Sequence, residues 1–313
     1  MLLVNLGTPA APTPAAVRRY LAEFLSDPRV VQLPRFIWLP ILHGIVLRSR
    51  PAKSAKKYES IWTPEGSPLA VHTRRQADLL RNFLSGEKIS VEHAMRYGEP
   101  GIADGLKKLS GCGKIAVVPL YPQFSRSTTE SIRDVLGTSV GPKLKMVESF
   151  HDHPAYIAAL AAGVRRHWTA HGKAEKLLMS FHGLPQRSVG QGDPYQAQCI
   201  ATAKILAGSL RIAPADYMIT FQSRFGAAEW LQPYTEPALV ALAQQGAKRV
   251  DVICPGFVSD CLETLEEIAI EARRAFLGAG GREFHALPCL NEAPEWIEAL
   301  GKIAASLVPP GAG

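Results

Sequence analysis

Short apolar runs alternate with longer stretches of helical periodicity along almost the whole chain. Strands are expected at 2–6, 89–97, 114–120, 143–148, 176–181, 216–221, 249–254 and 283–287. Helices are expected between and after them, at 73–84, 154–171, 194–210, 233–245, 262–277 and 293–307. Strands that alternate with helices favour parallel sheets covered on both faces. We therefore predict an α/β protein with two similar halves, 1–150 and 151–313, whose last helix packs back on the first half.

Composition limits the class of protein and its partners. The chain has 313 residues, enough for two domains, and its 47% hydrophobic and 20% charged residues are normal for a globular enzyme. The net charge of +7 favours acidic partners. No run of Lys and Arg is interleaved with aromatic residues, so we expect no nucleic acid. The five cysteines have no CxxC spacing, which indicates a reducing compartment.

One histidine stands where a predicted strand ends. His182 follows the apolar run at 177–179, and Gly183 and Pro185 behind it favour a sharp turn. The carboxyl ends of parallel strands meet at one edge of a sheet, where ligands bind. A lone histidine after a strand is commonly a hydrogen-bonded structural residue. An imidazole at that edge also suits metal binding or proton transfer near neutral pH.

A row of carboxylates follows the strand predicted at 249–254. Glu263, Glu267 and Glu271 are spaced four residues apart, which on an α-helix places them on one face. Such a face is usually solvated, and a position at a helix N-terminus explains Glu263 without any function. The row contains no basic residue before Arg273, so its mutual repulsion favours a bound cation. A carboxylate ladder of this kind is a candidate path for a metal ion.

The segment 33–47 is almost wholly apolar, although it carries Arg35, Pro40 and His43. Its composition favours a buried helix with a kink. The alternative is an exposed apolar lip that contacts a membrane or a hydrophobic ligand. Basic residues follow at once, as in peripheral contacts with anionic membranes: Arg48, Arg50, Lys53, Lys56 and Lys57. The sequence has no stretch of about 20 apolar residues, so we expect no transmembrane helix.

Two further loops follow predicted strands and are rich in polar side chains. Tyr121 opens the first, at 121–129, and Ser223 stands in the second, with Trp230 shortly after it. Hydroxyl and backbone N–H groups in such loops bind anions, but a hydroxyl there can equally be an ordinary helix N-cap. Trp230 can stack on a planar ligand or belong to the core.

Six motifs, in this order, resemble those of the ferrochelatase family. They are spread over nearly the whole chain, at 4–9, 66–69, 121–125, 180–185, 220–224 and 257–265. The resemblance, to the bacterial form, implies two Rossmann-like domains, each with a mostly four-stranded parallel sheet, and a porphyrin cleft between them. It implies a lyase that inserts Fe²⁺ into protoporphyrin IX, makes protohaem and releases two protons, as the terminal step of haem biosynthesis.

The resemblance also implies roles for individual residues. His182 matches the family's active-site histidine, as base and metal ligand, and Glu263 its active-site glutamate, as metal ligand or proton relay. Glu267 and Glu271 match acidic positions on its metal-lined helix. Porphyrin contacts are implied for Arg96, Tyr121, Ser67, Ser223 and Trp230. This set agrees with the chemistry, because insertion into a flat macrocycle needs a base, a weakly held metal and apolar walls that bend the ring.

The sequence departs from parts of the family pattern. Position 6 is Leu where some members carry an axial-ligand tyrosine, and position 261 is Cys where some carry His. The chain ends at Gly313 without the Cys-rich tail that carries a [2Fe–2S] cluster in animal members, so we expect no such cluster. The expected partners are protoporphyrin IX and ferrous iron. We expect a cytoplasmic monomer with a peripheral contact on the inner face of the membrane.

Two alternatives stay open on the sequence. The first is a chelatase for coproporphyrin or another tetrapyrrole. Sirohydrochlorin, with eight carboxylates, demands a more basic cleft than the lip suggests, whereas coproporphyrin is disfavoured only by Leu6. The second is a non-enzymatic porphyrin or haem carrier. A carrier has no use for a base that faces an acidic ladder, and it would be expected to keep a strong axial ligand.

Overall fold

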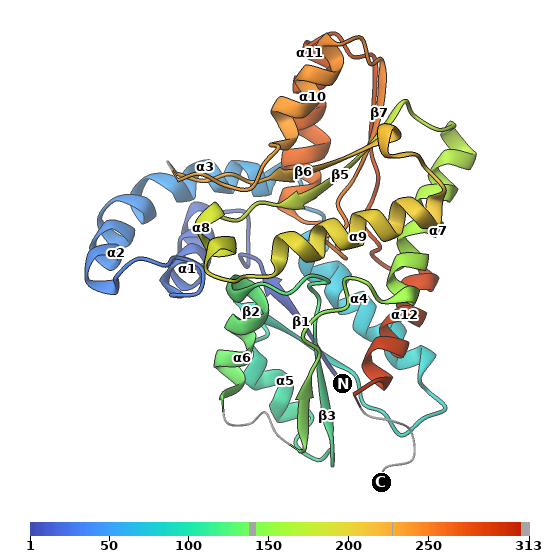
Figure 1. The fold of residues 1–313 in the computed structure, drawn as a ribbon. Coiled ribbons are helices and arrows are strands. Elements are labelled where there is room, and N and C mark those ends of the chain that lie inside the picture. The colour runs from blue at the N-terminus through green and yellow to red at the C-terminus, as the bar shows by residue number, and fades with distance from the viewer. Residues whose placement is uncertain (138–141, 227, 308–313) are drawn as a thin grey trace. The chain divides into compact units, whose positions relative to one another are not determined.

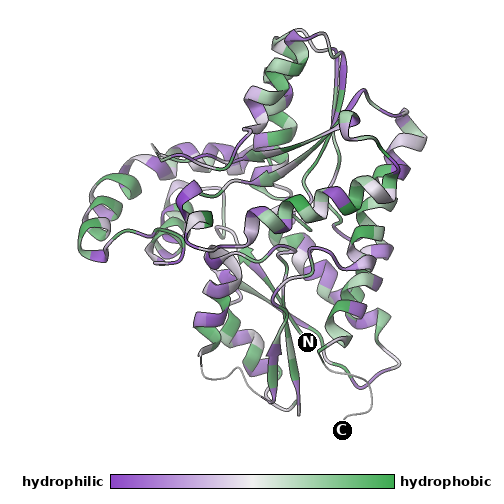
Figure 2. Cartoon of the chain, viewed as in Figure 1, coloured by the Kyte–Doolittle hydropathy of each residue, from purple (hydrophilic) through white to green (hydrophobic). Residues whose placement is uncertain are grey.

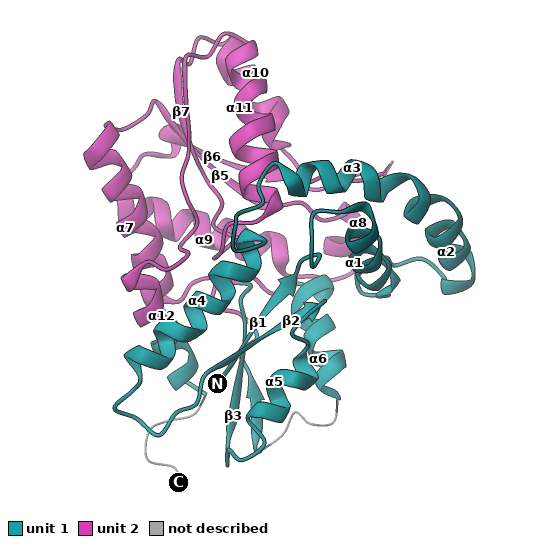
Figure 3. Ribbon diagram, turned by 180° about the vertical axis from the view of Figure 1, so that it is seen from behind, with its two compact units in different colours: residues 1–121, 125–148, 300–313 teal, residues 122–124, 149–299 magenta. Residues whose placement is uncertain are grey.

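The computed structural model describes residues 1–137, 142–226 and 228–307. The chain divides into two compact units, coloured teal and magenta in Figure 3. Unit 1 comprises residues 1–121, 125–148 and 300–313, and unit 2 comprises 122–124 and 149–299. Each unit is built around its own four-stranded parallel sheet (Figure 1). The predicted α/β class with two Rossmann-like sheets is therefore confirmed.

The sheet of unit 1 has the strand order β2-β1-β3-β4. Its strands are β1 (Leu2–Gly7), β2 (Glu92–Tyr97), β3 (Ile115–Pro119) and β4 (Leu144–Met146). Its helices are α1 (Pro14–Ser26), α2 (Arg35–Ile41), the π-helix η1 (Leu42–Val46), α3 (Leu47–Glu59), α4 (Pro68–Phe83), α5 (Ile102–Lys108), the π-helix η2 (Arg126–Glu130) and α6 (Ser131–Leu136).

Alternation along β1 separates the two faces of this sheet. Leu2 and Val4 pack on one face in a buried cluster with Ile102 of α5 and Ile132 of α6. Asn5 lies on the opposite face of the sheet, and its amide donates to the hydroxyl of Thr73 on α4 (2.9 Å). Helices therefore cover both faces, as a parallel sheet requires.

The sheet of unit 2 has the equivalent order, β6-β5-β7-β8. Its strands are β5 (Lys176–His182), β6 (Tyr217–Gln222), β7 (Arg249–Ile253) and β8 (Glu283–Ala286). The helices that begin in this unit are α7 (Pro154–His171), α8 (Gln186–Gly190), α9 (Tyr195–Leu210), the 3-10 helix η4 (Pro214–Asp216), α10 (Thr235–Gln244), the π-helix η5 (Glu263–Ala272), α11 (Arg273–Gly278) and α12 (Pro294–Ala305).

The two faces of this sheet are covered by different helices. On one face, Leu178 and Val252 share a buried cluster with Leu239 of α10 and Ile268 of η5. On the other, the fully buried Asp251 of β7 accepts a hydrogen bond from the indole of Trp168 on α7 (2.8 Å). The short helices α8 and η4 were not predicted, but the strands and the longer helical stretches of this unit start and end within a few residues of their predicted positions, because each carries a clear period.

The apolar segment 33–47 is not the buried helix that its composition favours. It forms α2 and η1, and α2 carries hydrophobic residues along much of its length (Figure 2). Phe36 is 79% exposed and Ile45 64% exposed, whereas Trp38 is buried and donates through its indole to the carbonyl of Leu25 (2.6 Å). One face anchors the segment and the other presents apolar side chains to solvent, so the structure has the exposed lip.

Candidate active site

The predicted catalytic segments of unit 2 meet where its strand order reverses. β5 and β7 are neighbours in the centre of the sheet, and the chain leaves them toward opposite edges, to β6 and to β8. In open α/β sheets the loops at the carboxyl ends of such strands form the ligand site. His182 is the last residue of β5, and Glu263 opens the first helix after β7.

One nitrogen of the His182 imidazole is already engaged. Nδ1 lies 2.6 Å from the carbonyl oxygen of Gly183, and since a carbonyl only accepts, Nδ1 carries the proton in the neutral ring. Nε2 therefore holds the lone pair, as a base or a metal ligand requires. The ring lies near two aromatic side chains, Trp230 with its centroid 6.5 Å away and Phe257 at 6.4 Å.

Gly183 is required by the close packing of this loop. Its N–H donates to the carbonyl of Gln222 (2.8 Å). A Cβ at position 183 would stand 2.8 Å from that carbonyl oxygen and 3.1 Å from the ring of Trp230. Beyond it, the N–H of Leu231 donates to the carbonyl of Leu184 (2.9 Å). The His182 loop is thus held directly against the loop that carries Trp230.

The glutamate row lies on a π-helix instead of the predicted α-helix. In η5 the backbone hydrogen bonds span five residues, so the helix winds more slowly and residues four apart stay near one face. Glu263, Glu267 and Glu271 are all half-buried, which argues against a plain solvated face. π-helices are rare, and the single-turn segments that do occur are often found at functional sites, whereas η5 is longer, at 10 residues.

Gln222 joins the His182 strand to this helix. It ends β6 as the register partner of His182. Its amide oxygen accepts from the hydroxyl of Ser180 (2.7 Å), and its amide nitrogen donates to the backbone carbonyl of Glu263 (2.9 Å) and to Oε2 of Glu267 (3.3 Å). Sequence reasoning missed this role, since Gln222 was visible only as part of a polar loop. Its buried position at the end of β6 brings its amide within hydrogen-bond distance of η5.

Glu267 is held in one orientation by Ser223. The backbone N–H of Ser223 donates to Oε1 (2.6 Å) and its hydroxyl to Oε2 (2.5 Å). Ser223 has φ of 65°, an uncommon conformation for a serine, and such strain persists only where the surroundings fix it. With the bond from Gln222, this carboxylate accepts from three donors. Ser223, a predicted porphyrin contact, therefore contacts the carboxylate of Glu267.

Glu263 lies beside a buried thiol. Burial, and then the neighbouring Glu263 carboxylate, raise the pKa of Cys261 well above its ordinary value, so the thiol stays protonated at neutral pH. The preceding Asp260 has a structural role, because it accepts from the hydroxyl of Thr264 (2.8 Å) and the amide of Asn291 (2.6 Å). This leaves the Glu263 carboxylate as the candidate metal ligand at the start of η5.

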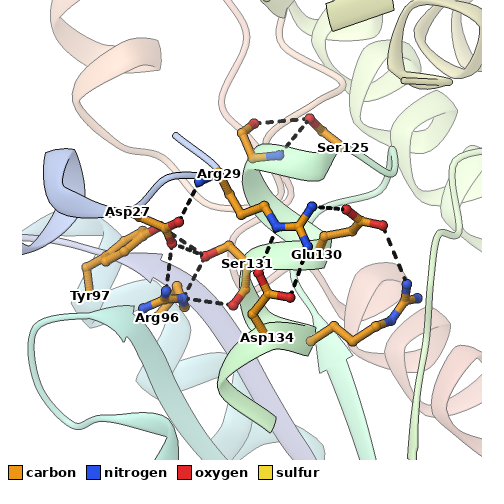
Figure 4. Close-up of polar contacts among 10 residues, drawn as sticks. Asp27, Arg29, Arg96, Tyr97, Ser125, Glu130, Ser131 and Asp134 are labelled. Carbon is orange, nitrogen blue, oxygen red and sulfur yellow. Dashed lines mark hydrogen bonds and ion pairs between the residues drawn. The ribbon is translucent and has the colours of Figure 1, made fainter. Parts of the chain in front are cut away.

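Arg96, a predicted porphyrin contact in unit 1, is committed to a buried network (Figure 4). Its guanidinium donates to Oδ2 of Asp27 (2.7 Å) and to the hydroxyl of Ser131 (2.7 Å). The hydroxyls of Tyr97 (2.8 Å) and Ser131 (2.6 Å) also donate to Asp27. The guanidinium thus already has a carboxylate partner, and it ties β2 to the end of α1 and to the start of α6.

The other predicted porphyrin contacts differ in their surroundings. The hydroxyl of Ser67, at the start of α4, accepts from that of Thr8 (2.8 Å). Burial raises the pKa of Tyr121, and its buried hydroxyl has no hydrogen-bond partner among the residues that the structure describes. The buried indole nitrogen of Trp230 has no partner within those residues either. Both groups can donate to a bound ligand, and an unpaired buried donor is otherwise unfavourable.

Known proteins match the chain over nearly its full length. The ferrochelatase family model matches residues 1–307. The ferrochelatase of Azoarcus sp. (strain BH72) is 60% identical over 308 residues, which is 96% of this chain and 85% of that protein. The ferrochelatase of Aromatoleum aromaticum is 57% identical over 318 residues, with 98% and 87% covered.

Solved structures support the fold. SirB from Bacillus subtilis with Fe³⁺ gives a TM-score of 0.55 at 13% identity and covers 77% of this chain and 93% of that one. CbiX, described as the terminal enzyme of sirohaem biosynthesis in denitrifying bacteria, gives 0.50 at 16% identity, with 97% of each chain covered. The identity to the curated proteins is far above the level at which relationship is in doubt, and the chain belongs to the ferrochelatase family.

Proposed function

We propose that this protein inserts Fe²⁺ into protoporphyrin IX and releases protohaem, as the terminal step of haem biosynthesis. The observation that carries the proposal is the hydrogen bond from Nδ1 of His182 to the Gly183 carbonyl, which leaves Nε2 as acceptor at the switch point of the sheet. Membership of the ferrochelatase family supports the same chemistry.

His182 is the proposed base. A free-base porphyrin must lose two inner N–H protons before all four of its nitrogens can bind the metal. Nε2 takes a proton, and the charged ring keeps its Nδ1–H bonded to the Gly183 carbonyl, so its orientation does not change. Glu263 then relays this proton outward, which frees Nε2 to take the second one. The rings of Trp230 and Phe257 lie close to the imidazole and restrict its movement.

The carboxylates of η5 are the proposed metal path. Fe²⁺ accepts oxygen and imidazole ligands, which Glu263, Glu271 and His182 supply. Glu267 already accepts three hydrogen bonds, so it adds negative charge without wrapping around the ion. Because only a few protein ligands hold the metal, its binding is weak, and weak binding allows its transfer to the porphyrin. No resident cofactor, and thus no [2Fe–2S] cluster, is needed for this step.

Five residues are proposed to contact the porphyrin: Ser67, Arg96, Tyr121, Ser223 and Trp230. The unpaired donors of Tyr121 and Trp230 support a role toward a ligand. Arg96 and Ser223 already bind carboxylates of the protein, so their proposed role is to hold the shape of the porphyrin-binding surface.

A peripheral contact with the membrane is proposed for the lip. Phe36 and Ile45 are exposed apolar groups, and a cavity of about 500 Å³ nearby is lined by Arg18, Arg19 and Arg48. Apolar insertion beside cationic groups fits an anionic bilayer surface. Among the described residues, none of the helices is long and apolar enough to cross a membrane. We propose a monomer that acts at the inner face of the membrane from the cytoplasm.

The test is anaerobic incubation of the purified protein with protoporphyrin IX and Fe²⁺, followed by porphyrin fluorescence, with His182→Ala in parallel. We expect catalytic loss of fluorescence and a haem spectrum from the wild type only. Quenching that stops at one porphyrin per protein would instead indicate a carrier. No turnover with protoporphyrin, but turnover with coproporphyrin, would assign the four-carboxylate substrate.

A further inference from the structure

A cluster of three histidines lies in unit 2, away from the glutamate row. His167 and His171 are one helical turn apart near the end of α7, and His285 is on the edge strand β8. The three ring centroids lie 4.8, 4.9 and 5.1 Å from one another, and one ligand atom from each residue lies within 4.8 Å of the others. Imidazoles packed this closely present several nitrogen lone pairs to one point.

Two carboxylates lie beside nitrogens of these rings. Nε2 of His285 lies 2.7 Å from Oε1 of Glu283, and Nε2 of His167 lies 3.4 Å from Oδ1 of Asp251. Metal-bound histidines typically have one nitrogen on the metal and the other facing a carboxylate, which fixes the tautomer and ring orientation. His285 is the register partner of Asp251, so strand pairing itself brings the two residues together.

The buried carboxylate in this cluster is incompletely satisfied. Asp251 is fully buried, and its Oδ1, like Nε2 of His167, makes no hydrogen bond within residues 1–137, 142–226 and 228–307. A buried anion with an unpaired oxygen is unfavourable unless positive charge lies close by.

Charged side chains also lie around these rings. Arg249 is one nearby cation, and its guanidinium donates to the carbonyls of His171 (2.6 Å) and Gly172 (2.8 Å) at the end of α7. It lies 3.5 Å from Glu283 and 3.9 Å from Asp251. The carboxylates of Asp251 and Glu283 thus both lie near this guanidinium.

From this arrangement we propose that His167, His171 and His285 form a second metal site, which binds a borderline divalent ion of the Zn²⁺ class. Imidazole ligands suit Zn²⁺, Fe²⁺, Ni²⁺ and Cu²⁺ and are poor ligands for Mg²⁺ and Ca²⁺. Three nitrogens bound tetrahedrally at about 2.0–2.1 Å stand about 3.4 Å apart. Rotation of the exposed His171 side chain closes the remaining gap.

Access to the site and its structural effect follow from the same residues. A cavity of about 300 Å³ reaches it, lined by His167, His171, Ile253 and Leu287 among others. A metal held by two residues of α7 and one of β8 ties the helix to the edge of the sheet. Binding should therefore raise the unfolding temperature, because the unfolded chain cannot bring the three ligands together.

The site is separate from the proposed catalytic metal site. Asp251 pairs with Leu177 of β5, and His182 lies five residues further along that strand. At a rise of about 3.3 Å per residue, the two places are roughly 16 Å apart along the strand. The inference therefore does not depend on which porphyrin the protein metallates.

The test is calorimetric titration with Zn²⁺, without porphyrin, in a His182→Ala background that removes the proposed catalytic ligand. We expect one Zn²⁺ to bind per chain and the unfolding temperature to rise. Adding His171→Ala should weaken binding by tenfold or more and abolish the rise, and so should His285→Gln. His43→Ala, which removes an exposed histidine outside the cluster, should leave both unchanged.

Two results would overturn the proposal. One is Zn²⁺ affinity weaker than about 0.1 mM in the His182→Ala protein. The other is equal affinity with and without His171→Ala, since the metal would then be bound elsewhere. Because the readout is metal binding and not catalysis, failure of the proposed chelatase reaction would leave both results interpretable. The visible spectrum of bound Co²⁺ serves as a second measurement, because it reports four-coordinate geometry directly.

Discussion

The side-chain amide of Gln222 donates a 2.9 Å hydrogen bond to the backbone carbonyl of Glu263. This bond links the end of β6 to the first turn of η5. The same amide group accepts from Ser180 on β5 and donates to Glu267. One buried side chain therefore fixes Glu263, the proposed proton relay, relative to the strand that carries His182. We call it a positioning residue, because its groups are taken up by protein partners.

Gln222→Leu should reduce turnover without unfolding the protein. Leucine has a similar size but no hydrogen-bond donor, so Glu263 and Glu267 lose the hydrogen bonds that orient them. We expect kcat to fall by about 10–100-fold, as for other residues that orient ligands indirectly, with a smaller change in KM for the porphyrin. Gln232→Leu, at an exposed glutamine, is the control. An equal fall in both variants would mean that the loss is not specific to position 222.

His182→Ala should abolish metal insertion while porphyrin binding persists. The substitution removes both the proposed base and a metal ligand, and removal of a general base alone costs about 10²–10⁴-fold in rate. Fluorescence titration with protoporphyrin measures binding, and single-turnover kinetics measure insertion. If insertion continued within tenfold of the wild-type rate, the proton acceptor would have to be another group.

Glu263→Gln and Glu267→Gln should separate chemistry from structure. Glu263→Gln should lose most activity with little change in unfolding temperature, because only the proposed relay is removed. Glu267 accepts from the N–H and hydroxyl of Ser223, which sits at positive φ, so its replacement should also destabilise the protein, by about 1–3 kcal/mol. Thermal unfolding and activity are measured on both. If Glu263→Gln alone lost stability, that residue would be a structural cap.

Asp27→Asn should destabilise unit 1. The carboxylate accepts from Arg96, Tyr97 and Ser131, and the exposed fractions of the Arg96 and Asp27 side chains are only 16% and 6%. Removing one partner leaves a buried charge uncompensated, which costs about 3 kcal/mol. Urea denaturation measures the change. Asp78→Asn, which removes an exposed partner of Arg81, should cost well under 1 kcal/mol.

The effect of Asp27 should depend on pH in a defined direction. Burial raises the pKa of its carboxyl, but hydrogen bonds from Ser131, the Arg29 backbone and Tyr97, with the charge of Arg96, outweigh burial and hold the pKa below its ordinary value of 3.8. A lowered folded-state pKa gives stability that is complete above the ordinary pKa and is lost as pH falls through the lowered one. The wild-type advantage over Asp27→Asn should therefore shrink below about pH 4. A difference that grew on acidification would contradict this sign.

Phe36→Ser should weaken binding to anionic vesicles and leave stability unchanged. Phe36 is 79% exposed, and substitutions at exposed sites typically change stability by no more than about 0.5 kcal/mol. Co-sedimentation with phosphatidylserine vesicles measures the effect. Trp38→Ser is the matched variant on the buried face of the same helix, and it should instead destabilise the protein. Unchanged sedimentation of Phe36→Ser would remove this residue from the membrane contact.

The sequence predicts the elements well where a period is long and clean. The helix expected at 154–171 is found at those residues, and β5 differs from its expected bounds only in reaching His182. For the segment 33–47, composition alone favoured a buried helix, whereas the expected apolar lip describes the exposed side chains, because apolar composition reports how hydrophobic a helix is but not which side of it has a partner. The π-helical winding of η5 was missed for a similar reason, since glutamates spaced four apart stay near one face in either helix.

Contacts between distant segments were beyond what spacing can reveal. His167 and His171 are visible as a pair in the sequence, but His285 joins them only through the pairing of β8 with β7. Gln222 likewise gains its role from the register that places it beside His182. Residues with a motif could be named in advance, whereas residues that act through burial and strand pairing could not.

The crowding around Gly183 affects how mutational data on this chain should be understood. An alanine there would press its methyl group against the carbonyl of Gln222, which cannot yield without moving the very residue that orients η5. Saturation mutagenesis should therefore find position 183 as intolerant of substitution as His182. Two adjacent intolerant positions would look like a catalytic pair, although the glycine contributes only a backbone carbonyl that accepts from His182 and the space left by its missing side chain.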